Sequence, residues 1–170
     1  MSITDYLIDS LLVLLVLLQI KERPLTNRSL IRPLVIVSVA VAVYLHGIPT
    51  GGNNLVLVAV LALLGALIGL ASAQAVIMRR AADGQVLARG GWASGFFWVL
   101  GMGSRFAFIV WITHGGFAAI AGFSAQHAIT SGQAWTAGLL AMALFEVLGR
   151  TALLAARRSQ LQRSAALSPA

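Results

Sequence analysis

Long apolar runs separated by short polar connections set the pattern of this sequence. A helix that crosses a bilayer needs about 20 mostly apolar residues. Five segments fit this requirement, namely residues 4–20, 30–48, 55–78, 93–114 and 134–156. The pattern predicts an all-α polytopic membrane protein: five transmembrane helices form one bundle over residues 1–156, and a basic cytoplasmic tail follows over residues 157–170.

The connections between these segments alternate in charge. Basic residues lie in the first loop (21–32), the third loop (79–91) and the tail, whereas the second and fourth loops carry no Lys or Arg. Basic loops stay on the cytoplasmic side of a membrane. We therefore expect the N-terminus outside, the C-terminus inside and five crossings. The preference for Arg over Lys, with abundant Ala and Gly, is associated with a bacterial source, which gives the cytoplasmic (inner) membrane as the expected location.

Composition supports the bilayer as the solvent of this chain. Its 170 residues are 59% hydrophobic and 10% charged, whereas soluble domains carry about 25% charged residues. The 12 basic residues exceed the 5 acidic ones, but they follow the loop pattern, so we expect lipid rather than nucleic acid as the partner. The absence of Cys excludes disulfides, thiolate metal sites and thiol redox chemistry by this chain.

The fourth loop, residues 115–133, is too polar to span a membrane. A short interfacial helix over Phe117–Ile129 would place Phe117, Ile120 and Phe123 on a membrane-facing stripe. A plain loop fits the same residues, and both alternatives stay open.

Two ionisable side chains fall near the middle of predicted spans. Arg105 lies in the fourth span and Glu146 in the fifth, about 18 Å and about 15 Å from the predicted inner ends. Each costs about 2.5–3.5 kcal/mol at a helix centre and therefore usually has a partner. Consecutive antiparallel helices are usually neighbours, so we expect an Arg105–Glu146 ion pair. It would either orient the two helices or line a polar cavity.

Two further polar residues belong to this hypothesis. Arg150 lies one turn below Glu146 at spacing i+4 and shares its face, although its long side chain is also expected to snorkel toward the inner surface. With Arg150 the cluster carries a net charge of +1, which leaves room for an anion or for water. Gln74 lies near the inner end of the third span and is expected to hydrogen-bond to an adjacent helix.

Small residues mark one face of the third span. Gly65 and Gly69 form a GxxxG motif that Ala73 continues at the same spacing. Such residues let helices approach closely in lipid. We expect packing within the bundle in the first place, and a homodimer or contact with another membrane protein as the alternative.

Three histidines, His46, His114 and His127, are expected on the outer side. Imidazole binds haem and transition metals, so they are candidate ligands. However, no nearby Cys or acidic residue completes a site and no haem-attachment motif is present. We therefore expect interfacial histidines and no cofactor, with haem or metal as the alternative.

No catalytic arrangement is recognisable, since the sequence has no Ser-His-Asp pattern, no HExxH and no phosphate-binding loop. The leading interpretation is a non-enzymatic accessory or assembly factor with a structural Arg–Glu pair. The alternatives are a transporter or ligand-binding protein with a polar mid-membrane cavity, and a haem- or metal-binding protein.

Three segments resemble small bacterial membrane proteins described as CcdC-like, which include actinobacterial members of undefined function. They are a basic loop with Pro (KERPLTNRSLIRP), a basic hairpin with Asp-Gly (RRAADGQVLARGG) and a helix that opens with Trp and carries a mid-membrane Arg (WASGFFWVLGMGSRF). The resemblance covers residues 20–110 and implies an association with cytochrome c maturation. It assigns no functional residue, and a chain without Cys has no thiol for a redox role.

Overall fold

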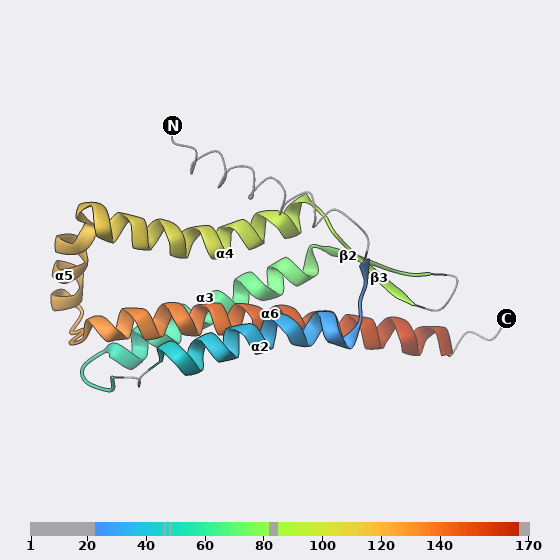
Figure 1. Ribbon diagram of the computed structural model, residues 1–170, viewed down its shortest axis with the longest axis horizontal. Helices are drawn as coiled ribbons and strands as arrows, with labels where there is room; N and C mark the ends of the chain where they lie inside the picture. Colours follow the sequence, from blue (N-terminus) through green and yellow to red (C-terminus); the bar gives the residue numbers. More distant parts are fainter. Residues whose placement is uncertain (1–22, 46, 48, 82–84, 167–170) are drawn as a thin grey trace.

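The computed structural model describes residues 23–45, 47, 49–81 and 85–166. The predicted first span, residues 4–20, and His46 lie outside these ranges. The described chain is mostly helical, with four long helices and one short helix joined at one end by a small sheet (Figure 1). The long helices are α2 (Asn27–Tyr44), α3 (Asn54–Gln74), α4 (Trp92–Trp111) and α6 (Gly132–Ala166).

Four helical stretches of the described residues are long and apolar enough to cross a membrane. Large apolar side chains such as Val39, Leu63 and Phe106 are exposed on their outer faces. An exposed apolar surface of this extent is expected where lipid replaces water as the solvent. The prediction of a helical membrane protein is therefore confirmed to this extent.

A short helix, α5 (Phe117–Gln126), decides between the two alternatives for the fourth loop in favour of a helix. A π-helical turn, η1 (Ile112–Gly116), joins it to α4, and Gly115 adopts a φ of 114° there. Because only glycine readily adopts this conformation, the chain can kink at this position. α5 consequently lies across the end of the bundle between α4 and α6 (Figure 1), with Phe117 and Phe123 exposed.

A three-stranded antiparallel sheet closes the opposite end of the bundle, with strand order β1-β3-β2. Its strands are β1 (Arg23–Pro24), β2 (Val76–Arg80) and β3 (Val86–Gly90). The sheet corrects the purely all-α prediction. The predicted third span ends at Gln74 rather than Met78, because β-branched Val76 and Ile77 favour a strand that pairs with β3. A count of apolar residues does not distinguish such a strand from the end of a helix.

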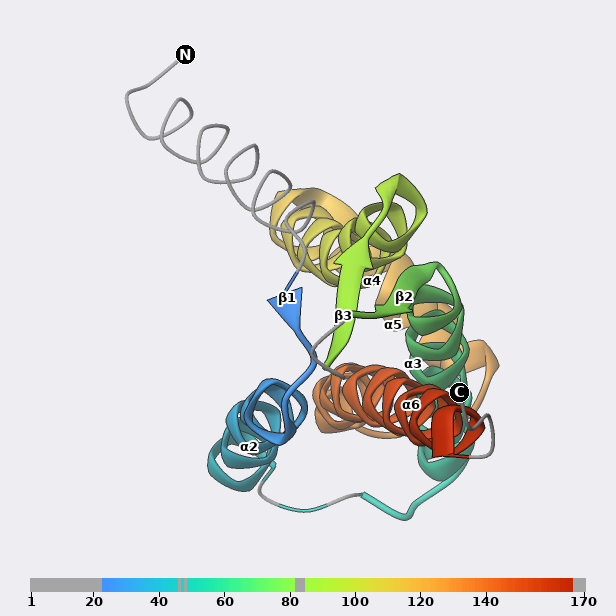
Figure 2. The same ribbon diagram turned by 90° about the vertical axis from the view of Figure 1, so that its right-hand side faces the viewer.

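Helix α6 forms the centre of the bundle, since α3 and α2 both pack on it, whereas α4 packs mainly on α3 (Figure 2). It also continues beyond the predicted boundary at Ala156 as far as Ala166. The tail therefore begins as helix. Within it, Arg157 donates hydrogen bonds to the carbonyl oxygens of Ala73 (2.7 Å) and Val76 (3.0 Å). These bonds connect α6 to the junction between α3 and β2.

At the other end, a polar contact joins the loop before α3 to the loop before α6. The buried side chain of Asn54 donates to the Thr130 hydroxyl (2.9 Å) and accepts from the Thr130 N–H (3.0 Å). Asn53 donates from its side-chain amide to the carbonyl oxygen of His127 (2.9 Å). The two loops are thereby held together where α3 and α6 begin.

Candidate functional site

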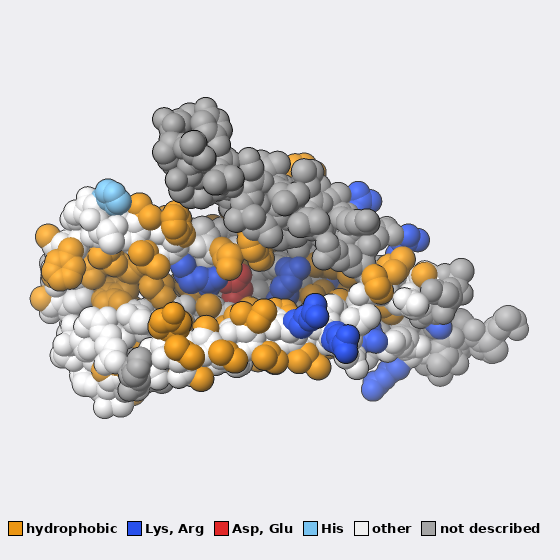
Figure 3. All heavy atoms as spheres, in the orientation of Figure 1, with side chains coloured by type: hydrophobic (Ala, Val, Ile, Leu, Met, Phe, Trp, Pro, Cys, Tyr) orange, Lys and Arg blue, Asp and Glu red, His pale blue; other side chains and the backbone are white. Residues whose placement is uncertain are grey.

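The Arg105 guanidinium and the Glu146 carboxylate form an ion pair between α4 and α6. Nη1 of Arg105 donates to Oε2 of Glu146 over 2.8 Å. Their side chains are only 17% and 11% exposed. Glu146 is the only acidic residue among those that the structure describes, and it lies between basic side chains in the middle of the bundle (Figure 3).

Two glycines make room for Glu146, one for its carboxylate and one for its backbone. A Cβ atom at Gly101 of α4 would lie 2.4 Å from Oε1 of Glu146, and one at Gly69 of α3 would lie 2.0 Å from the Glu146 carbonyl oxygen. Real Cβ atoms do not approach other atoms so closely, so any other residue would displace the helix or the carboxylate. Both neighbouring helices are therefore fitted to the position of Glu146.

Arg150 points into the bundle and does not snorkel to the surface. Its Nη1 donates to the hydroxyl groups of Ser72 on α3 and of Ser94 on α4, the latter over 3.4 Å. Both serines are buried. Among the described residues, the ion pair of Glu146 is with Arg105, and Arg150 has neutral hydroxyl partners instead. The positive charge of Arg150 is thus oriented by the protein without a directly paired carboxylate from the described chain.

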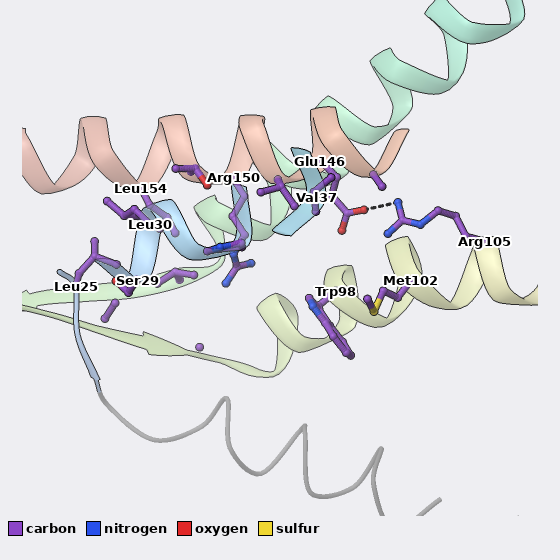
Figure 4. Close-up of a pocket in the computed structure, with 17 residues that line it drawn as sticks. Leu25, Ser29, Leu30, Val37, Trp98, Met102, Arg105, Glu146, Arg150 and Leu154 are labelled. Carbon is purple, nitrogen blue, oxygen red and sulfur yellow. Dashed lines mark hydrogen bonds and ion pairs between the residues drawn. The ribbon is translucent and has the colours of Figure 1, made fainter. Parts of the chain in front are cut away.

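A cavity of about 440 Å³ connects these charges. Figure 4 shows Arg105, Glu146 and Arg150 directed into it, with Trp98 and Met102 of α4 on one side and Val37 of α2 among the other residues of the wall. Most of the remaining lining is apolar and comes from α2, β2, β3, α6 and the link between β1 and α2, including Leu25, Leu30, Pro33, Val76 and Leu154. A charged group surrounded by hydrocarbon walls is the arrangement that suits an amphiphile.

The structure places the other predicted residues elsewhere. Gln74 is exposed and does not line the cavity, because α3 ends at this residue and turns into β2. Gly65 and Gly69 face α6, where a Cβ at Gly65 would lie 2.0 Å from the Met142 carbonyl oxygen. Ala73 is fully buried in the same bundle. This small-residue face therefore packs on α6 within the bundle.

The described histidines lie outside the cavity. The Nδ1 atoms of His114 and His127 lie 2.8 Å and 2.9 Å from the carbonyl oxygens of Val110 and Phe123, four residues earlier in the chain. His127 also stacks on the Phe123 ring at 4.0 Å. No group of three metal-ligating side chains occurs among the described residues. His46 lies outside that part of the chain, so the expectation of no cofactor and its alternative, haem or metal binding through the histidines, both stay predictions.

Sequence reasoning missed Ser72 and Ser94, which orient Arg150. A small hydroxyl residue in an apolar span is common and carries little signal by itself. The position of Ser72 in the sequence is a better indicator. It follows Gly69 by three residues and so lies on the glycine-lined side of α3 that faces α6. No feature of the sequence pointed to Ser94, because its contact with Arg150 is recognisable only when α4 is placed beside α3.

No family model, curated protein or solved structure matches this chain. The resemblance to CcdC-like proteins stays a prediction from the sequence.

Proposed function

We propose that this chain is a non-enzymatic, multi-pass protein of the bacterial cytoplasmic membrane that binds a small amphiphilic ligand with an anionic group. Five transmembrane helices, with the N-terminus outside, agree with the distribution of basic residues in the sequence. The observation that carries the proposal is the cavity of about 440 Å³ between α2, α4 and α6, in which two guanidinium groups face one carboxylate.

The charges of the cavity favour an anion as the ligand group. Arg105 is paired with Glu146, whereas Arg150 is held by two serine hydroxyls. A guanidinium held in a low-dielectric cavity attracts a carboxylate or phosphate, with which it can form two parallel hydrogen bonds. The apolar walls formed by Leu30, Val37 and Met102 suit a hydrocarbon chain. A fatty acid and a phospholipid share this chemistry.

Photolabelling tests the proposal directly. The protein in lipid nanodiscs is exposed to a photoreactive fatty acid and, in parallel, to the photoreactive alcohol of the same chain length. We expect the acid to label peptides from α2 and α4 that line the cavity, and Arg150→Gln to reduce this labelling at least about tenfold, as for loss of a close charge pair. Arg163→Gln, an exposed residue of α6, serves as the matched control.

The proposal fails if the acid and the alcohol label the cavity equally and Arg150→Gln changes nothing. Gln keeps a donor for Ser72 and Ser94, so the variant is expected to fold. A photoreactive phospholipid in place of the fatty acid distinguishes the two sources of the same head-group chemistry.

A second candidate, an accessory or assembly factor that works by helix contacts, is favoured by one observation. The Arg105–Glu146 pair is satisfied within the chain at 2.8 Å, as expected for a charge pair that only orients helices. In that case exchange of the two charges, Arg105→Glu with Glu146→Arg, should restore the folding that either single variant loses, and the cavity should take up neither photoreactive probe.

A further inference from the structure

A second cavity adjoins the one that contains Arg150, on the far side of the Arg105–Glu146 pair. It has a volume of about 540 Å³ and lies between α4, α5 and α6. Arg105 and Ala143 line both cavities, so the two meet at the ion pair. We propose that this second cavity, the chain groove, holds the hydrocarbon chain of a fatty acid whose carboxylate binds Arg150 in the first, the head-group cavity. The ligand chemistry rests on the proposed function, which is here narrowed to a single-chain acid.

The walls of the chain groove are apolar. Arg105, at the end next to the head-group cavity, is the one charged residue among the described residues that line it, and Trp135 and Thr136 are the other polar ones. The Trp135 indole N–H donates to the Ser124 hydroxyl over 3.1 Å and is satisfied, and a Thr hydroxyl can bond to its own helix backbone. A polar ligand group would find few partners here, which costs free energy, whereas a hydrocarbon chain needs none.

Aromatic rings close the end of the groove at α5. The Trp135 ring stacks on Phe108 of α4 with centroids 5.3 Å apart, and its centroid lies 6.0 Å from that of Phe123 on α5. Phe117 and Ile120 of α5 line the same end. The groove thus runs from a guanidinium at one end to a cluster of aromatic rings at the other, which gives a bound amphiphile a single orientation.

The distances along α6 match the length of a membrane fatty acid. Helix α6 rises about 15 Å over the ten residues from Arg150 to Leu140, which lines the groove. Half of a hydrocarbon core about 30 Å thick has the same depth, and an ordinary acyl chain spans it. A chain whose carboxylate is at Arg150 therefore ends beside Leu140. A six-carbon chain is too short to pass Ala143, which lies seven residues, about 10 Å, from Arg150.

The groove is accessible from the lipid side of the described chain. Ile109 and Phe117 in its wall are 54% and 71% exposed. Figure 3 shows hydrophobic side chains gathered at the α5 end, beside the charges in the middle of the bundle. Lipid tails are as apolar as these side chains, so a chain gains little free energy when it moves from the bilayer into the groove. The carboxylate at Arg150 therefore supplies the affinity, and the groove fixes where the chain lies.

Two photoreactive hexadecanoic acids test where the chain lies. One carries the diazirine beside the carboxylate and the other carries it near the last carbon, and each is added to the protein in lipid nanodiscs. We expect the first to label the head-group cavity and the second to label α6 at Leu139 and Leu140. Ala143→Phe, which fills the junction of the two cavities, should reduce the second labelling at least about fivefold and leave the first in place. Ala152→Phe, at an exposed position of α6 that lines neither cavity, is the matched control.

A shorter acid needs no variant. Hexanoic acid with the same terminal diazirine should label the head-group cavity alone, so this arm still decides the question if Ala143→Phe does not fold. Labelling of Leu140 by the hexanoic probe, or labelling by the long acid that Ala143→Phe leaves unchanged, would overturn the chain groove. Equal labelling of Leu140 by a phosphatidic acid with the same group on one chain would overturn the single-chain ligand.

Failure of the chain groove is distinguishable from failure of the proposed function. If the probe with the diazirine beside the carboxylate labels the head-group cavity, Arg150→Gln reduces this labelling and the terminal probe leaves α6 unlabelled, the chain groove fails and the proposed function stands. If neither probe labels the head-group cavity and Arg150→Gln changes nothing, both fail.

Discussion

Removal of one partner of the Arg105–Glu146 pair should destabilise the protein far more than removal of both. The two side chains are 17% and 11% exposed and meet at 2.8 Å, so Glu146→Gln leaves a guanidinium in an apolar cavity without its carboxylate. Breaking a buried pair in this way costs about 3–5 kcal/mol. This corresponds to a factor of about 200 to 5,000 in the unfolding equilibrium.

The double variant Arg105→Met with Glu146→Met separates this cost from a general loss of packing. Methionine approximates the length of both side chains and leaves no charge behind, and replacement of a buried ion pair by apolar residues is often neutral. We expect the double variant to regain most of the stability that Glu146→Gln loses. Reversible unfolding in mixed micelles, followed by circular dichroism, gives the free energy of unfolding of each variant. The value for the control Arg163→Gln should stay within about 0.5 kcal/mol of the parent.

Two results would refute this reasoning. If Glu146→Gln lost less than about 1 kcal/mol, the carboxylate would be solvated rather than buried, because exposed pairs have this magnitude. If the loss of stability in the double variant equalled the sum of the losses in Arg105→Met and Glu146→Met alone, the two side chains would contribute independently. Either outcome would remove the ion pair as the link between α4 and α6.

Three further perturbations test the surroundings of the pair by the same unfolding assay. Gly69→Ala should cost about 1–3 kcal/mol, because its Cβ would meet the Glu146 carbonyl oxygen. The control Gly122→Ala in α5, with open space around it, should be neutral or stabilising, and equal effects of the two variants would contradict the α3–α6 packing. Asn54→Ala should cost about 1–3 kcal/mol, because two hydrogen bonds to Thr130 are lost at a buried position, and unchanged stability would show that the loops are held otherwise. Arg157→Gln should destabilise the junction of α3 and β2, because three carbonyl oxygens lose a charged donor, which faster amide exchange in β2 would reveal.

The sequence predicted the helices of this chain better than their ends. Apolar runs of about 20 residues locate α2, α3, α4 and α6, because a segment in lipid must satisfy its backbone hydrogen bonds internally and therefore forms a helix. The strand that begins at Val76 escaped prediction, since its first three residues, 76–78, are as apolar as the helix before it. Its pairing with β3 is a tertiary contact between residues on either side of a turn. The continuation of α6 beyond Ala156 escaped for a related reason, because a helix that leaves the membrane no longer needs an apolar sequence.

The candidate site was likewise predicted only in part. Depth along two consecutive antiparallel helices was sufficient to predict that Arg105 meets Glu146. Arg150 was expected to snorkel, because its side chain is long enough to reach the interface. Its actual direction depends on Ser72 and Ser94, which become neighbours only when α3 and α4 are packed. Gln74 was assigned by depth alone and is exposed, because α3 ends at this residue and turns into β2.

The distance between the Arg105 guanidinium and the Glu146 carboxylate in a lipid bilayer tests the central claim most directly. The sequence has two glutamates, Glu22 and Glu146, so a Glu22→Gln background leaves Glu146 as the one ¹³C-labelled glutamate carboxylate. Solid-state NMR with ¹⁵N-labelled arginine should then show strong carbon–nitrogen dipolar dephasing, consistent with the 2.8 Å N–O contact, and Arg105→Gln should remove most of it. A carboxylate signal without dephasing, or with dephasing that Arg105→Gln leaves unchanged, would contradict an ion pair between α4 and α6.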